Sequence, residues 1–168
     1  MGHDLPLTPN FGLHELLPRG WDGSVPPEVL GNLITLAEDL LEPARAYMGR
    51  AIHISSGWRP EAMNARVDGA AKESDHTRGR AADIWPDGSG PEDWQLATVR
   101  LFHWMRTRLV GRFGQLILED HRVAEGRSTA LWLHVAIPSV KHPGHGDINA
   151  VLLSPRKGVY EVFREPRA

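Results

Sequence analysis

The chain has 168 residues, of which 41% are hydrophobic and 24% charged, and its net charge is −2 at pH 7. This length suits one soluble domain with a real core, and the charge gives no basic field that would collect nucleic acid or an anionic membrane. There is no cysteine, so a disulfide framework and a thiolate zinc site are both excluded, and any bound metal must be held by His, Asp or Glu.

The N-terminal sequence MGHDLPLTPNF lacks the basic start and apolar run of a signal peptide. No stretch approaches the roughly 20 apolar residues of a membrane span. We therefore expect synthesis in the cytoplasm, no membrane insertion, and delivery by another route if the protein acts outside the cell. We also expect a monomer.

The first half of the chain predicts helices and a short strand. Phe11–Leu17 suggests a brief helix, and the apolar residues between Pro26 and Gly49 recur at helical spacing, with Pro43 expected to kink or end that helix. Residues 51–55 read as a strand and residues 60–67 as a small helix. The following stretch, with Gly69, is expected to be a loop.

The second half predicts a sheet and one long helix. Residues 80–85 read as a strand, and a helix is expected from about Pro91 to Leu109. Residues 115–119 and 130–137 are two β-like runs that we interpret as a hairpin, and a last strand is expected near 151–153 or 159–163. Helices and strands do not alternate, so the prediction is a single α+β domain, mainly antiparallel, over residues 1–168.

His76 and Asp83 are the first candidate metal ligands. A loop histidine and an aspartate on the next strand cannot share a helical face at this spacing, but they can converge on one ion. A catalytic zinc site usually takes three protein ligands, and His134 is the best third candidate because an imidazole inside an apolar strand needs a partner. Considered singly, each of these residues is also compatible with a structural role.

A set of motifs resembles one known family. Ser56-Gly57-Trp58-Arg59, Asn64, Ser74-Asp75-His76 and Gly79-Arg80-Ala81-Ala82-Asp83 follow one another in the order and spacing found in the zinc D-Ala-D-Ala carboxypeptidase family. That family shares its fold with the Hedgehog signalling domain. The similarity extends from Phe11-Gly12-Leu13-His14-Glu15-Leu16 to Trp132-Leu133-His134-Val135 and covers about residues 8–137, which leaves 138–168 as a C-terminal extension.

The resemblance implies a Hedgehog/DD-peptidase-like fold and a zinc-dependent carboxypeptidase or endopeptidase that acts on bacterial peptidoglycan, as endolysins and cell-wall enzymes do. It implies one Zn²⁺ per chain on His76, Asp83 and His134, where the ion lowers the pKa of water and polarises the scissile carbonyl. Arg59 then steadies the substrate carbonyl, and Ser74 helps to orient the peptide. Trp132 is a candidate wall of the peptide groove.

The general base is less clear from the sequence. Several branches of the family have an acidic residue three positions before the last histidine, where this chain has Leu131. If the predicted hairpin forms, Glu119 lies across from about Leu131 and can serve as the base, with Asp120 and His121 as alternatives. The missing acid at position 131 favours a second hypothesis, a zinc-stabilised cell-wall or peptide-binding module without turnover.

Overall fold

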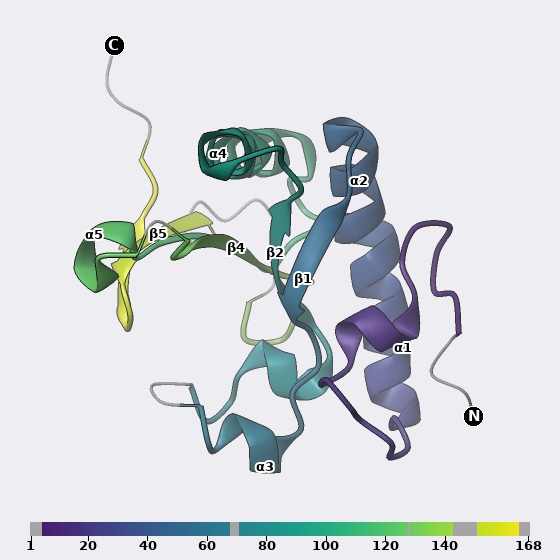
Figure 1. The fold of residues 1–168 in the computed structure, drawn as a ribbon. Helices are drawn as coiled ribbons and strands as arrows, with labels where there is room; N and C mark the ends of the chain where they lie inside the picture. The colour runs from purple at the N-terminus through teal and green to yellow at the C-terminus, as the bar shows by residue number, and fades with distance from the viewer. Residues whose placement is uncertain (1–4, 68–70, 128, 143–150, 165–168) are drawn as a thin grey trace.

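The computed structural model describes residues 5–67, 71–127, 129–142 and 151–164. The helical elements are η1 (Leu13–Leu16), α1 (Pro27–Leu36), the π-helical turn η2 (Ala37–Leu41), α2 (Glu42–Met48), α3 (Glu61–Asn64), η3 (Asp75–Arg78), α4 (Pro91–Arg108) and α5 (Arg122–Glu125). The strands are β1 (Ile52–Ser56), β2 (Ala81–Pro86), β3 (Gln115–Asp120), β4 (Leu131–Ala136), β5 (Val151–Arg156) and β6 (Val159–Val162). The predicted α+β class is confirmed, with helices flanking a mixed sheet (Figure 1).

The six strands form one sheet in the order β1-β2-β4-β3-β5-β6. The predicted β3–β4 hairpin is present, although its connection contains the short helix α5. Both candidate tail strands form, and β5 pairs with β3 in parallel while the other neighbours are antiparallel. Gly69 of the predicted loop lies outside the described residues.

The long helix predicted from Pro26 to Gly49 continues through Pro43 without breaking. Proline cannot donate the main-chain hydrogen bond of a helix, and its ring collides with the carbonyl one turn earlier. The chain accommodates this residue by widening the preceding turn: the N–H of Glu42 bonds to the carbonyl of Ala37, which is π-helical geometry. Gly49 then ends α2 in the left-handed conformation, with φ of 62°.

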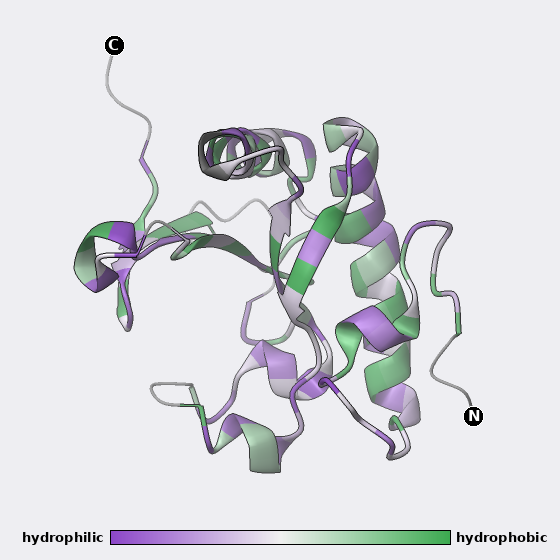
Figure 2. Ribbon diagram, in the orientation of Figure 1, coloured by the Kyte–Doolittle hydropathy of each residue, from purple (hydrophilic) through white to green (hydrophobic). Residues whose placement is uncertain are grey.

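Alternation along the central strands separates a core face from a polar face. Leu116, Leu133 and Val135 are fully buried on the core face, where α4 packs against β2, β3 and β4. The opposite face carries His134, and Glu119 shares it because residues two apart lie on the same side of a strand. Figure 2 shows this mixture of apolar and polar residues along the sheet, and the apolar residues of the α1–α2 helix.

Candidate metal centre and catalytic cleft

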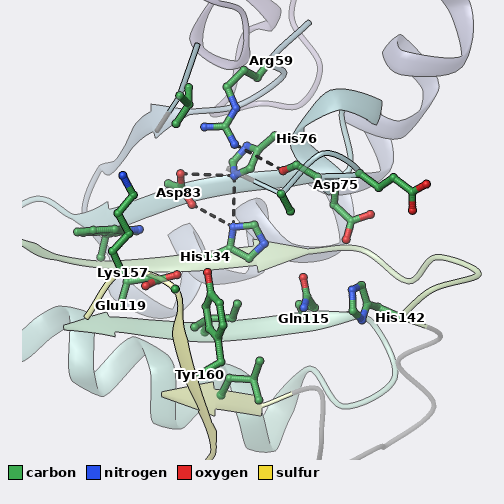
Figure 3. Close-up of a pocket in the computed structure, with 18 of the residues that line it drawn as sticks. Arg59, Asp75, His76, Asp83, Gln115, Glu119, His134, His142, Lys157 and Tyr160 are labelled. Carbon is green, nitrogen blue, oxygen red and sulfur yellow. Dashed lines mark hydrogen bonds and ion pairs between the residues drawn. The ribbon is translucent and has the colours of Figure 1, made fainter. Parts of the chain in front are cut away.

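The three predicted ligands meet on the polar face of the sheet. Nδ1 of His134 lies 3.1 Å from Oδ1 of Asp83 and 3.2 Å from Nε2 of His76, and Nε2 of His76 lies 3.4 Å from Oδ2 of Asp83 (Figure 3). Within the described ranges, these three residues form the group of His, Asp or Glu side chains that can hold a metal ion.

Strand register brings two of these residues together. Asp83 on β2 lies directly opposite His134 on β4 in an antiparallel pair. Side chains of directly opposite residues leave the sheet on the same face with their Cβ atoms about 5 Å apart. Two residues that are 51 positions apart in the chain thus become neighbours through main-chain hydrogen bonds alone.

The third residue, His76, is positioned by the turn η3. Its Nδ1–H donates to the carbonyl of Gly57 at 2.8 Å, which orients the ring and directs Nε2 at Asp83 and His134. The turn itself is held by the Thr77 hydroxyl, which donates to the Ser74 carbonyl at 2.7 Å. Gly79 closes it with φ of 68°, a conformation that glycine adopts without strain.

The donor set and its dimensions fit a zinc ion. Ligand atoms about 2.0–2.1 Å from a tetrahedral zinc lie roughly 3.3 Å from one another. The separation of 3.2 Å between the two imidazole nitrogens is close to this value, and the Asp83 carboxylate reaches each of them within 3.4 Å through one of its two oxygens. Two neutral imidazoles and one carboxylate leave a divalent ion with net positive charge, as Lewis-acid chemistry requires.

The electrostatics of the cluster favour an ionised aspartate and a protonated His134 when no metal is bound. Burial raises the pKa of Asp83, but His76 and the hydrogen bonds from both histidines outweigh this and hold that pKa well below its ordinary value. Burial lowers the pKa of His134, whereas the hydrogen bond to Asp83 and the nearby acidic charges bring the net pKa above its ordinary value. A proton and a metal ion therefore compete for binding to His134.

Arg59 and Ser74 line the cleft next to the cluster. The Nη2 group of Arg59 lies 3.5 Å from the Ser74 hydroxyl, at the outer limit of a hydrogen bond. Burial lowers the pKa of Arg59 and the Asp83 charge opposes the shift, but a guanidinium stays protonated in either case. The arrangement places a fixed cation beside the three candidate ligands (Figure 3).

Glu119 lines the same cleft from β3. It is only 7% exposed, and its charge contributes to the raised pKa of His134. Its register partner is Trp132, whereas Leu131 lies opposite Asp120, so the expected pairing was displaced by one residue. This displacement matters because Trp132 shares the cleft face with His134, whereas Leu131 is buried on the core face.

The cleft has a volume of about 370 Å³ and is lined from several separate elements. The model of the family peptidase M15 matches residues 14–117, more than half of the chain. The chain belongs to the peptidase M15 family. No similar protein was found among the curated proteins.

The M15 family consists of zinc peptidases of the D-Ala-D-Ala carboxypeptidase type, so the family predicted from the motifs is confirmed. The matched region includes His76 and Asp83 together with Arg59 and Ser74, and it ends at Ile117. Glu119 and His134 follow this boundary, so their places in this M15 chain rest on the strand register and the distances above.

The two alternative bases lie in different surroundings. Asp120 points to the other side of β3, where Arg122 donates to both of its carboxylate oxygens at 2.7 Å and lowers its pKa. His121 is 4% exposed, and its Nε2 lies 2.8 Å from Oε2 of Glu119 and 3.1 Å from the Ser154 hydroxyl. Glu119 is thus the acidic member of the three that lines the cleft together with the candidate ligands.

Several cleft residues of this M15 chain were not anticipated from its sequence. Gln115 lies on the same face of β3 as Glu119, and strand alternation alone would have identified it. Tyr160 and Lys157 come from the β5–β6 hairpin, which also contributes to the cleft wall (Figure 3). No motif marks these two residues, because their approach depends on β5 joining the sheet beside β3.

Proposed function

We propose that this M15 chain is a zinc-dependent peptidase that hydrolyses a peptide bond in the stem peptides or cross-links of bacterial peptidoglycan. The observation that carries this proposal is the convergence of His76, Asp83 and His134 at distances suited to one zinc ion, at the base of an open cleft. Family membership supports the reaction class.

His76, Asp83 and His134 would hold the ion through Nε2, the carboxylate and Nδ1, respectively. When bound, zinc supplies a Lewis acid that polarises the scissile carbonyl and makes water a stronger nucleophile at neutral pH. The buried bond from His76 Nδ1–H to Gly57 keeps that imidazole oriented. Proton transfer and stabilisation of the carbonyl oxygen depend on side chains of the protein.

Glu119 is the proposed general base. Its carboxylate accepts a proton from the attacking water and then delivers that proton to the nitrogen of the leaving amine. Its location on the cleft face, near enough to affect the pKa of His134, supports this role. The bond from His121 holds one carboxylate oxygen and leaves the other available for proton transfer.

Arg59 is proposed to bind the carbonyl oxygen as negative charge develops on it. A guanidinium that is already in place beside the reacting group requires no reorganisation during the reaction, which is where fixed charges are most effective. Ser74, next to Arg59, is proposed to orient the peptide through a hydrogen bond. The half-buried indole of Trp132 offers an apolar wall for the substrate.

Peptidoglycan as the substrate, and action at the cell wall after phage lysis or another form of export, are both parts of the proposal. The cleft opens to solvent, and the proposal covers both a chain terminus and an internal peptide bond as the substrate. Carboxypeptidase and endopeptidase actions are thus both compatible with it. Among the described helices, none has the length and apolar character needed to cross a bilayer.

The alternative is a zinc-stabilised binding module without turnover. Its support was the lack of an acid at position 131, but Leu131 is 1% exposed on the core face and has no access to the cleft. Glu119 supplies an acidic group on the correct face. Stoichiometric zinc without any release of new amino groups from muropeptides would favour the binding module.

Digestion of purified sacculi followed by mass spectrometry of the muropeptides tests the proposal. We expect new amino groups at one type of bond, loss of activity with a chelator and recovery with zinc. Glu119→Gln should retain zinc but lose activity by at least about 100-fold, as expected for a general base, whereas the exposed Glu38→Gln serves as the matched control. Full activity in Glu119→Gln would refute the role of this residue.

A further inference from the structure

A second groove of about 580 Å³ lies beside the catalytic cleft. Its walls come from η1 and the segment that follows it, from the end of β1 and from the region of α3. Arg59 and Val67 line both cavities, so the groove and the cleft are contiguous. A ligand that extends from the candidate metal centre past Arg59 would enter this groove.

The groove has an excess of positive charge. Arg19, Arg59 and Arg66 line it, and Glu15 is the acidic residue among its lining groups. The Glu15 carboxylate is already engaged, since it accepts a hydrogen bond from the N–H of Gly12 at 2.8 Å. Neither Arg19 nor Arg66 forms an ion pair with any residue that the structure describes, so both guanidinium groups can receive an anion.

Arg59 also has an unused hydrogen-bond donor. Its Nε–H is buried and has no hydrogen-bond partner among the described residues. A buried donor without a partner costs free energy, so an oxygen supplied by a ligand at this point would be favourable. The groove also exposes apolar area at Met63 and Val67, which are 40% and 41% exposed and can pack against aliphatic groups of a peptide.

The walls of the groove are held in place by the main chain. The N–H of Trp58 donates to the carbonyl of Leu16 at 2.7 Å, which joins the end of β1 to η1. The indole of Trp58 donates to the carbonyl of Thr77 at 3.2 Å and ties the same turn to the segment that carries His76. The groove therefore has a fixed position relative to the metal centre.

We infer that this groove is a subsite for a carboxylate of the peptide substrate, bound by Arg19 and Arg66 on the far side of Arg59 from the candidate metal centre. The inference rests on the proposed peptidase function. A stem peptide offers such a carboxylate either on its D-glutamate residue or at its C-terminus, and guanidinium groups recognise both in the same way. The identity of the bound carboxylate determines which peptide bond of the substrate lies at the candidate metal centre.

The test compares the zinc-loaded wild type with Arg19→Gln/Arg66→Gln, the conservative Arg19→Lys/Arg66→Lys, and Arg112→Gln as a control at an exposed arginine outside both cavities. The substrates are a synthetic stem pentapeptide with free carboxylates, the same peptide amidated on D-glutamate, and the same peptide amidated at its C-terminus. Steady-state kinetics give kcat and KM, and calorimetry with the Glu119→Gln form of each variant gives the dissociation constant.

We expect the double Gln variant to raise KM and Kd for the free peptide about tenfold, since each exposed charge contact contributes roughly a threefold effect. The kcat should change less than twofold, the Lys variant should recover part of the loss, and the difference should shrink in high salt. The amide that removes the advantage of the wild type over the double variant identifies the carboxylate that binds.

Equal KM and Kd in the wild type and the double variant for all three peptides, with hydrolysis intact, would overturn the subsite and leave the proposed function standing. Absence of hydrolysis of these peptides and of purified sacculi, together with arginine-dependent binding of the free peptide, would refute the peptidase function and retain the subsite. A loss of kcat without a change in Kd would also overturn the subsite.

Discussion

The imidazole of His121 and the carboxylate of Glu119 form a buried pair, with Nε2 2.8 Å from Oε2. The same Nε2 also lies 3.1 Å from the Ser154 hydroxyl, and Nδ1 on the other side of the ring lies 3.4 Å from Oε1 of Glu125. Its ring also meets Trp132 edge-on, with 4.9 Å between centroids. These contacts make His121 a positioning residue for Glu119 at the wall of the cleft.

Replacement of His121 should therefore reduce turnover more than binding. We expect His121→Leu to lower kcat about tenfold or more, because a misplaced base transfers protons less efficiently, with KM changed less than threefold. The pH profile of kcat should shift in this variant, and His121→Gln, which keeps a donor, should restore part of the rate. The exposed His53→Gln is the control. An unchanged kcat and pH profile in His121→Leu would remove the positioning role.

Asp83→Asn should abolish stoichiometric zinc binding. The amide has nearly the shape of the carboxylate but lacks the negative charge that both histidines contact. Metal analysis after dialysis against micromolar zinc should give about one zinc per chain for the wild type and much less for the variant. Asp22→Asn, at an exposed position, should bind zinc normally. Retention of one tightly bound zinc by Asp83→Asn would exclude Asp83 as a ligand.

The stability of the protein should depend on pH in opposite ways with and without zinc. In the metal-free protein the pKa of His134 is raised above its unfolded value near 6.5. Its contribution to folding stability is therefore complete below about pH 6.5 and is lost as the pH rises through the pKa of the folded state. The pKa of Asp83 is lowered, so its contribution is present above about 3.8 and is lost as the pH falls through the folded value.

The interaction of Asp83 with His134 should therefore stabilise the metal-free protein most between about pH 4 and 6.5. Zinc displaces the proton from His134, so its affinity should fall as the pH drops through the raised pKa of that residue. We expect the difference in Tm between the zinc-loaded and chelated protein to widen from pH 5.5 to 8. A difference that is constant over this range would contradict the proton–metal competition.

Gly57→Ala should destabilise the fold. An added Cβ would lie 2.4 Å from the carbonyl oxygen of Leu16, which is a main-chain atom with little freedom to move. The expected loss is about 1–3 kcal/mol, typical of overpacking, and zinc affinity should also fall because Gly57 accepts the bond from His76. Chemical denaturation and zinc titration measure both effects.

Gly31→Ala is the matched control for that substitution. Gly31 lies inside α1, and an added Cβ would meet no atom within 4 Å. Alanine in the interior of a helix should stabilise the protein by about 0.5–1 kcal/mol without any effect on zinc. Similar effects of the two substitutions would show that the close approach of Leu16 to Gly57 does not constrain this turn.

Local structure and the types of chemical group could be predicted from the amino-acid sequence. Apolar spacing predicted the helix before Gly49 and the strands that carry Asp83 and His134, because these periods follow from the geometry of a single element. The motifs around His76 predicted the family, which the peptidase M15 match confirms. Pro43 was expected to interrupt the helix, but a π-helical turn absorbs it.

Which of these groups meet depends on how the strands assemble into the sheet. Alternation tells which residues share a face of one strand, but it does not set the partner strand or the register. The pairing of Asp83 with His134, of Glu119 with Trp132 in place of Leu131, and of β5 in parallel with β3 each required the assembled sheet. The burial of His121 beside Glu119 likewise depends on Ser154 from β5, because contacts between distant segments form only when the whole core packs.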